Sequence, residues 1–466
     1  MRIENEQINQ GYFWLPSNPN KKIPGTLSIK NGGKVELEVI GHFDDGFATL
    51  TEQIELNRII GLVENHNLIT LEKCFYKNKN FSFGGVSRSK IHVNQALAGV
   101  EYEQEEQLSF ESISFSVDGL EEWVGMSGIS VQHEKDFLGA LVKFTPPESL
   151  TYSLKDGMEL NICFGYTLPT IKPNPINFSI LQNTYFKLTS KNPLPLNDFI
   201  FIVHKIATLL NFAMDSTVSI KNVFCFSSTI TREVNGKIRP EPIQLFYESE
   251  PFSEIKPKTD WHTMLFRFVD IKDRFNEVVD KWLDAYETIS PSLNLYFSNK
   301  IGAHTYLDGQ FLTLAQALET YHRRTSNDTL MPKKSFNTLI KQIKSHCPEE
   351  HKEWLSQRLD YGNELSLRTR LHRIIESCKS TIGTSEEVEL IVKNIVDTRN
   401  YFTHYDLRLE NKAASGQNLW NLCQKMEAIF QLHLLKELCF DEVEINAVLN
   451  NTYSFRNKLQ NTAISA

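Results

Sequence analysis

The chain has 466 residues, a net charge of −8 at neutral pH and 41% hydrophobic residues. These are the values of an ordinary globular protein, so they exclude wholesale disorder and a strongly basic nucleic-acid coat. The charge is uneven, because residues 320–380 carry 12 Lys and Arg against 7 Asp and Glu. A local basic patch on an acidic chain is therefore expected.

The first 225 residues have the patterns of β-strands. Segments 25–30 and 34–40 flank Asn31-Gly32-Gly33, and apolar residues alternate with polar ones, which predicts a strand pair with a tight turn. Asn235-Gly236 predicts a later hairpin that leads to a strand over 243–247. One helix is expected after a cap at Leu196-Asn197-Asp198, and its apolar run 199–214 is too short to span a bilayer. Further strands are expected at 108–117, 139–144, 160–166 and 184–188.

From about Trp261 the apolar spacing becomes helical, and Pro291 is expected to end the first long helix. From 311 onward, short connections between helices favour an antiparallel bundle. We therefore predict an α+β protein with a β-rich region, a helical connector, an all-α bundle and a polar, frayed tail, at 1–255, 256–300, 301–450 and 451–466. The bundle's apolar stripes are Leu314/Leu318/Tyr321, Phe336/Leu339/Ile340/Ile343, Trp354/Leu355/Leu359, Leu367/Leu371/Ile374/Cys378 and Leu422/Met426/Ile429/His433.

The most informative helix is expected over about 385–402, after the capping box Thr384-x-x-Glu387. Its core-facing seam runs through Val388, Val392 and Ile395, and the next position on that seam is Arg399. A guanidinium on a core seam is costly unless it is paired or faces a polar cavity. Such a departure from the local pattern marks a candidate functional site.

His404 follows five residues after Arg399, so on a continuous helix the two side chains lie about 140° apart. Two geometries would bring them to one site: the helix ends or bends near 401–403, or a second subunit completes the site. Together the pair suits RNA phosphodiester chemistry, in which an imidazole moves protons and a guanidinium holds the phosphate. Asn400 could hold either the imidazole or the phosphate. The competing interpretation is a surface histidine and an arginine paired with Asp397 or Asp406.

These residues, in the order Arg399-Asn400-Tyr401-Phe402-Thr403-His404, resemble the R-x4-6-H motif of HEPN domains. The segment LTLAQALETYHRR at 312–324 resembles the first HEPN helix of ApeA-type proteins. The segments GYFWLP, IPGTLSI, KVELEVIG and ALAGVEYEQEEQLSFESISFSVDGLEEWVG resemble the ApeA N-terminal domain, so the similarity covers about residues 10–445.

The resemblance implies a bacterial anti-phage defence factor that acts by abortive infection, with a metal-independent endoribonuclease in its HEPN domain. It implies that Arg399 and His404 are the catalytic pair, that Asn400 is the polar position after the arginine, and that two copies form a homodimer. The expected partner is RNA, with tRNA among the candidates, and a phage-encoded trigger protein is a further candidate. The N-terminal domain would be a sensor or regulator. The alternative is a catalytically silent HEPN module that binds protein or RNA.

No cofactor, metal or membrane is expected, and the location expected is the cytoplasm. The seven scattered cysteines lack a CxxC pair, which favours reduced thiols. His346, Cys347 and His351 are close in sequence, but Pro348 separates them and no second ligand pair is near. Arg323 is expected to pair with Glu319 or to border the RNA site, and His433 to be a core histidine. Five basic residues have either an RNA-steering or a merely solvated role: Arg358, Arg368, Arg370, His372 and Arg373.

Overall fold

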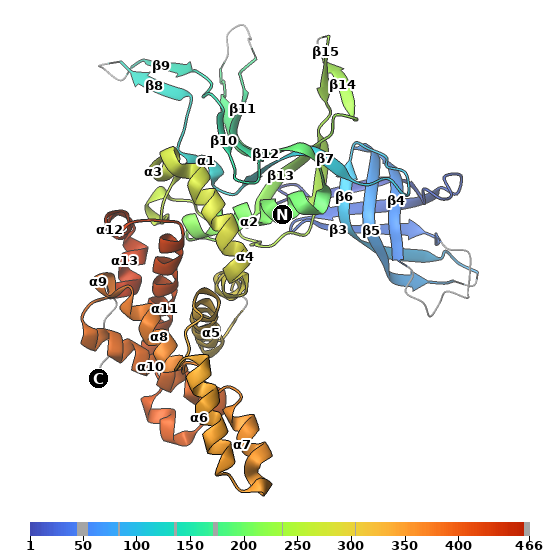
Figure 1. The fold of residues 1–466 in the computed structure, drawn as a ribbon. Coiled ribbons are helices and arrows are strands. Elements are labelled where there is room, and N and C mark those ends of the chain that lie inside the picture. Colours follow the sequence, from blue (N-terminus) through green and yellow to red (C-terminus); the bar gives the residue numbers. More distant parts are fainter. Residues whose placement is uncertain are drawn as a thin grey trace. The chain divides into compact units, whose positions relative to one another are not determined.

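The computed structural model describes residues 1–43, 55–82, 84–134, 138–170, 176–234, 236–302 and 304–460. The chain divides into two compact units, residues 1–283 and 284–466. The first unit is rich in strands and the second is helical, which confirms the predicted α+β class (Figure 1). The division falls inside one long helix, α4 (Phe275–Lys300).

Six antiparallel strands at the start of the first unit form a β-barrel. The barrel closes because β5 pairs with both β4 and β6, while β3, β2 and β1 connect β6 to β4. Side chains alternate between the interior and the outside, and Leu37 and Val93 are among the interior residues with no exposed surface. The strands are β1 (Gln7–Trp14), β2 (Ile23–Lys30), β3 (Lys34–Ile40), β4 (Glu55–Val63), β5 (Asn67–Asn80) and β6 (Arg88–Ala98).

The turn between β2 and β3 confirms the predicted strand pair. Lys30 lies opposite Lys34, and the two glycines between them have positive φ angles of 93° and 77°. At Gly33 a Cβ atom would lie 1.9 Å from the backbone oxygen of Tyr247. The turn therefore needs glycine there both for its backbone angle and for the close approach of β16 (Ile243–Tyr247).

The sheet continues beyond the barrel from β6 through β16, β13, β7, β12 and β11 to β10. The strands expected at 108–117, 139–144, 160–166, 184–188 and 243–247 are all present. Asn235 lies outside the described residues, although the strands on either side of it form a hairpin. The remaining strands are β7 (Ser109–Val117), β8 (Ile129–His133), β9 (Ala140–Phe144), β10 (Leu150–Ser153), β11 (Glu159–Thr167), β12 (Leu181–Pro195), β13 (Ile220–Phe226), β14 (Thr231–Val234) and β15 (Lys237–Pro240).

Helix α2 (Leu196–Ala213) packs against β7 and β12, and it is the expected buried helix. Among the described residues it alone is long and apolar enough to cross a membrane, but 67% of it is buried. The expected cap is wrong: Pro195 precedes the helix without a side-chain cap, and the Asn197 oxygen accepts from Lys73 and Gln95 instead. The unit also contains α1 (Leu120–Val124), α3 (Phe268–Ile271) and the 3-10 turns Trp261–Thr263 and Lys272–Arg274.

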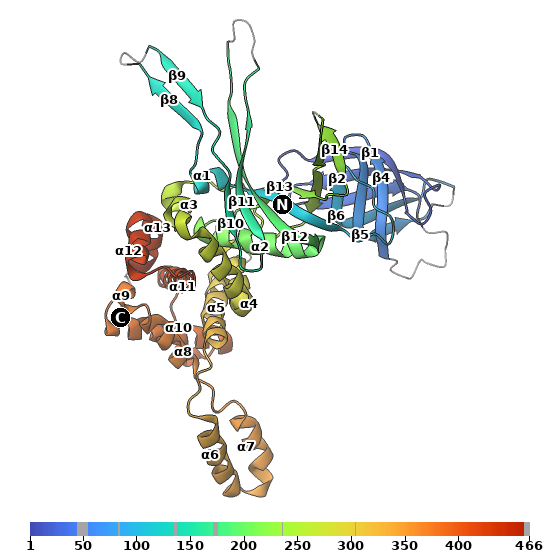
Figure 2. The same ribbon diagram turned by 45° about the horizontal axis from the view of Figure 1, so that its top comes forward.

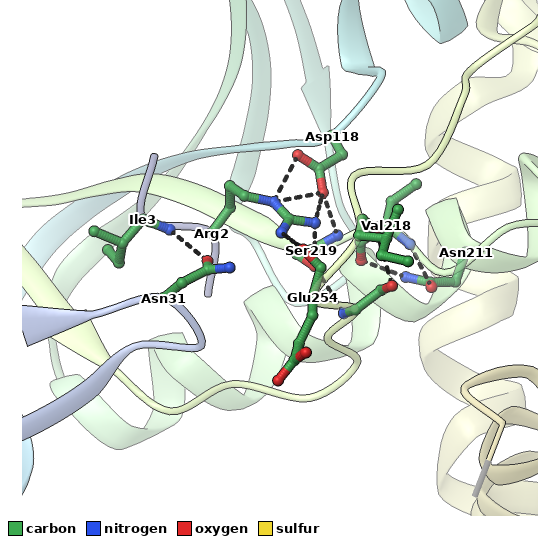
Figure 3. A network of polar contacts seen from close by, with 10 residues as sticks. Arg2, Ile3, Asn31, Asp118, Asn211, Val218, Ser219 and Glu254 are labelled. Atoms are coloured by element: carbon green, nitrogen blue, oxygen red, sulfur yellow. Dashed lines mark hydrogen bonds and ion pairs between the residues drawn. The ribbon is translucent and has the colours of Figure 1, made fainter. Parts of the chain in front are cut away.

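A buried ion pair joins the start of the chain to the sheet. The Arg2 guanidinium donates to both carboxylate oxygens of Asp118, with the shortest distance 2.9 Å, and also to the carbonyl of Glu254 (Figure 3). The Ser219 backbone N–H donates to the same Asp118 carboxylate. The segments around Arg2 and Ser219 are thus held at the Asp118 carboxylate, and Arg2 also holds the segment around Glu254.

Helix α4 continues through Pro291, so the prediction that proline ends it is wrong. A proline inside a helix removes one backbone hydrogen bond and costs about 3 kcal/mol. One face of the turns on both sides of Pro291 is buried, and the burial of this face offsets the lost bond. The buried side chains are Ile289, Ser292, Leu293 and Tyr296.

The helical unit is built around α11 (Gly416–Glu437), whose residues from Leu422 to Leu435 are buried except Gln424. Helix α11 contacts α5, α10 and α13, and α8 packs against α5 and α10. The packing of these helices buries the stripes expected around Leu318, Leu371 and Met426. The surrounding helices are α5 (Leu307–Thr325), α8 (Leu367–Glu376), α9 (Lys379–Ile382), α10 (Ser385–His404), α12 (Glu442–Asn451) and α13 (Tyr453–Gln460).

Two of the expected bundle helices lie outside the bundle. Helices α6 (Lys333–Ser345) and α7 (Lys352–Leu359), with the turn Glu349–His351 between them, form a hairpin that extends away from the other helices of this unit (Figure 2). Neither helix has a buried residue, and Trp354 is 59% exposed. The predicted helices exist, but the assumption that their apolar stripes face a core is wrong.

The polar tail is also more ordered than expected. Residues 453–460 form α13, in which Phe455 is fully buried. Lys458 lies 2.8 Å from an oxygen of Glu427, which also binds Lys300 at 2.5 Å. A buried carboxylate between two lysines therefore fixes this helix on α11. Residues 461–466 lie outside the described residues.

Candidate functional site

Helix α10 carries Arg399, Asn400 and His404. Its start is the predicted capping box, because the Thr384 hydroxyl accepts from the Glu387 N–H and the Glu387 carboxylate accepts from the Thr384 N–H. Val388, Val392 and Ile395 have no exposed surface, as the seam requires. The seam continues at Phe402, whose ring lies edge-on to Phe311.

Arg399 is the polar exception on this seam, and it is half-buried. Its Nη1 atom lies 3.4 Å from the Asn400 side-chain oxygen, to which it donates. In the described part of the chain no carboxylate forms an ion pair with it. Asp406 instead binds Arg408 at 2.7 Å, and this pairing is the main reason that the pKa of Asp406 falls to about 2. The guanidinium therefore keeps donors available for an anion.

His404 is the last residue of α10, and its side chain is exposed. The helix ends at Tyr405, which adopts the left-handed conformation with φ 49°. The expectation that the helix ends or bends at 401–403 is therefore wrong. Completion by a second subunit remains the other geometry.

Asn400 connects the two sides of the helix. It lies four residues before His404, and residues at this spacing are neighbours on one helix face. Its side-chain oxygen holds the Arg399 guanidinium, which belongs to the adjoining seam. The imidazole and the Asn400 amide thus share a face, and the guanidinium is turned toward that face by its hydrogen bond.

The basic residues of the 320–380 segment are mostly paired. Arg323 binds Glu319 at 3.0 Å and also Glu364, while Arg373 binds Asp328. Arg370 is buried and donates to the Leu365 carbonyl. Arg368 and His372 both contact Glu389. For all of the five candidate RNA-steering residues except Arg358, these pairings favour a role within the protein's own structure over a role in steering RNA. A further concentration of positive charge in this segment lies on α6, which has four lysines and no acidic residue.

Two further histidine candidates have structural surroundings. His433 is buried and its Nε2 atom lies 3.1 Å from the Ile374 carbonyl oxygen, as expected of a core histidine. His346 is 2.9 Å from the Gln342 carbonyl, and His351 contacts Glu350. Among the described residues no group of three or more His, Cys, Asp or Glu could hold a metal ion.

A groove of about 440 Å³ runs beside α10 and was not predicted. Its walls are α10, the 3-10 turn Leu407–Lys412 with the two alanines that follow, and the start of α11. The sequence gives a partial signal, because Lys393 and Asp397 lie on the His404 face of the helix. The contribution of Asn411, Lys412 and Asn418 depends on tertiary structure. The groove is lined by Leu390, Lys393, Asn394, Asp397, Asn411, Lys412, Ala413, Ala414, Asn418 and Leu422.

The fold and this helix define a two-part protein with a β-barrel region and a helical HEPN-type domain. The family model of ApeA N-terminal domain 1 matches residues 9–282, and the model of the Apea-like HEPN domain matches residues 312–444. The chain therefore belongs to the ApeA-like proteins with a C-terminal HEPN domain. No curated protein and no solved structure matches it significantly. HEPN domains are generally ribonucleases, and the family indicates an anti-phage defence nuclease.

Proposed function

We propose that the protein is a metal-independent endoribonuclease of bacterial anti-phage defence, acting in the cytoplasm as a homodimer. The proposal rests above all on Arg399, a cation on the seam of α10 that no carboxylate of the described chain neutralises. A half-buried charge of this kind is costly unless it serves an anion. The RNA phosphate is an anion of the right shape, because its oxygens match the planar guanidinium fork.

In the proposed reaction the ribose 2′-oxygen attacks the adjacent phosphorus, and the bond from phosphorus to the 5′-oxygen breaks. The products are a 2′,3′-cyclic phosphate and a free 5′-hydroxyl. His404 takes the proton of the 2′-hydroxyl or gives a proton to the leaving 5′-oxygen. Arg399 stabilises the charge on the non-bridging oxygens, and Asn400 holds the guanidinium in place.

Two protons move in this reaction, and one imidazole in one protonation state cannot move both at once. A second copy of the chain would supply a second His404 to the same phosphate. It would also place the Arg399 of one copy beside the imidazole of the other copy. Within one copy the two residues lie on different sides of the continuous helix α10. A homodimer through the HEPN domain satisfies both requirements.

The decisive experiment is RNA cleavage by the purified full chain in the presence of EDTA. We expect cleavage with cyclic-phosphate ends, and we expect His404→Ala to reduce the rate by about 100-fold or more, since general acid–base groups contribute 10²–10⁴-fold. The melting temperature of the variant should equal that of the wild type, because His404 is exposed. Cleavage that stops with EDTA and returns with a divalent metal would contradict the mechanism.

The second candidate is a silent HEPN module that binds RNA, such as tRNA, or a phage-encoded protein. The backbone separation of Arg399 and His404 on an unbroken helix favours it. Here Arg399 would serve stability alone. Arg399→Ala should then lower the melting temperature, while His404→Ala should change neither stability nor toxicity to the host cell.

A further inference from the structure

The groove beside α10 is polar and its groups lack partners within the described protein. Lys393, Asp397 and Lys412 make no ion pair there, although all three line the same hollow. The side-chain nitrogen of Asn394 is buried and has no hydrogen-bond partner. A buried amide without a partner costs about 1–3 kcal/mol, so this amide is explained if a ligand accepts its hydrogen bond.

The groove also has apolar surface and a fixed wall. Leu390 and the buried Leu422 line it together with Ala413 and Ala414. The Ala414 N–H donates to the hydroxyl of the fully buried Thr398 at 2.9 Å, which ties this wall to α10. A volume of about 440 Å³ lies within the range of about 300–1,000 Å³ that holds small ligands.

The groove leads toward His404. At 100° per residue, Lys393 and Asp397 lie within about 20° of His404 around the helix axis. Asp397 is about 10 Å from His404 along the axis, at 1.5 Å per residue. A ligand in the groove would therefore be close to the candidate catalytic imidazole.

We infer that this groove binds one nucleotide of the substrate RNA strand near the cleaved bond, and that it selects a base with an exocyclic amino group; the inference rests on the proposed function. The Asp397 carboxylate accepts hydrogen bonds, so it accepts from the exocyclic amino group of adenine, cytosine or guanine, whereas uracil has no amino group and offers only its ring N3–H. The Asn394 amide reads the base edge. Lys393 and Lys412 are exposed at the groove and neutralise the adjoining phosphates.

The test is binding of short single-stranded oligo(A), oligo(C) and oligo(U) to the full chain carrying His404→Ala, which prevents cleavage. We expect oligo(A) or oligo(C) to bind about 5-fold or more tightly than oligo(U), as for a base contact. Asp397→Asn and Asn394→Ala should reduce that ratio without changing the salt dependence. Lys393→Ala and Lys412→Ala should weaken all three oligomers alike and lower the salt slope by about 1.

The matched control is Lys237→Ala, which removes an exposed lysine of β15 in the other unit and should change none of these values. Melting temperatures verify that each variant is folded. Equal affinity for the three oligomers, or a ratio unchanged by both base-reading variants, would overturn the inference. So would AMP binding as tightly as oligo(A), because a free nucleotide would then be the occupant. A wild type that never cleaves RNA but shows the expected ratios would refute the nuclease and leave the groove assignment standing.

Discussion

The Asp118 carboxylate holds both Arg2, near the start of the chain, and the backbone of Ser219, directly before β13, and Arg2 in turn donates to the carbonyl of Glu254. Asp118 has no exposed surface, and it binds the Arg2 guanidinium at 2.9 Å (Figure 3). Breaking a buried pair from one side leaves an uncompensated charge and costs about 3–5 kcal/mol. We predict that Asp118→Ala lowers the free energy of unfolding of the N-terminal unit by about this amount, measured by denaturant titration.

An exposed pair on the same sheet provides the control for this prediction. Arg88 and Glu38 lie 3.1 Å apart with side chains 60% and 50% exposed. Exposed pairs contribute about 0–1 kcal/mol. Arg88→Ala should therefore change the stability little. Equal losses from both substitutions would show that the burial of Asp118 has no special effect.

His433 gives the helical unit a defined pH dependence. Burial is the main reason that its pKa falls to about 4; the hydrogen bond to the Ile374 carbonyl opposes this shift, and the nearby Lys436 and His322 add smaller lowering effects. Because the folded pKa lies below the unfolded value of about 6.5, the unfolded chain binds more protons between these values. Stability of the helical unit should thus fall as the pH decreases from about 6.5 to 4, by on the order of 3 kcal/mol. His433→Gln should flatten this part of the curve in melting experiments, and an unchanged slope would rule out His433 as its source.

At the scale of elements, the α6–α7 hairpin should be separable from the bundle. No residue of either helix is buried, and the hairpin closes at its base through Asn363, whose side chain bonds both the N–H and the carbonyl of Met331. Replacing residues 333–361 by a short Gly-Ser linker should leave the melting temperature of the helical unit within about 2 °C, which corresponds to about 0.5–1 kcal/mol for a unit of this size. Circular dichroism would measure it.

The comparison for this deletion is Phe455→Ala in α13. Phe455 has no exposed surface, and removing a buried aromatic ring costs about 3–5 kcal/mol. The single substitution should therefore destabilise the unit more than the loss of the whole hairpin. A large loss from the linker variant would mean that α6 and α7 do contribute to the core.

Helices α5 and α6 show which features of the fold can be predicted from the sequence. The stripe of Leu314, Leu318 and Tyr321 on α5 and the stripe of Leu339 and Ile343 on α6 have the same helical spacing. Both predict a helix correctly, but the stripe of α5 is buried because α11 packs on it, whereas α6 packs on α7 and has no buried residue. Spacing is a local property, whereas burial depends on residues distant in sequence.

The candidate site, too, was predicted only where the signal lies within a single element. The capping box and the seam of α10 predicted the helix and identified Arg399, since these signals lie within one element. The helix end at His404 was not predicted, because it depends on Tyr405 adopting a left-handed conformation. The groove was missed as well, since Asn411 and Asn418 reach it only through the packing of α10 against the following segments.

At the scale of the whole molecule, the proposed site needs two copies, and this need is testable without a structure of the dimer. Neither a chain carrying Arg399→Ala nor one carrying His404→Ala should cleave RNA alone. If the guanidinium of one copy serves the imidazole of the other, a mixed dimer of the two variants keeps one intact pair. We predict that co-expression of the two variants restores cleavage above that of either variant alone but well below half of the wild-type level, because the mixed dimer keeps one guanidinium–imidazole pair but only one of the two imidazoles that move protons. The cleavage is measured on purified mixed dimers carrying two different tags. The double variant mixed with wild type is the control, because it retains no complementary pair across the dimer. Mixed dimers that form but cleave RNA no faster than either variant alone would contradict a guanidinium–imidazole pair shared between copies, and a wild-type chain that cleaves RNA as a monomer in sedimentation experiments would remove the requirement for a second copy.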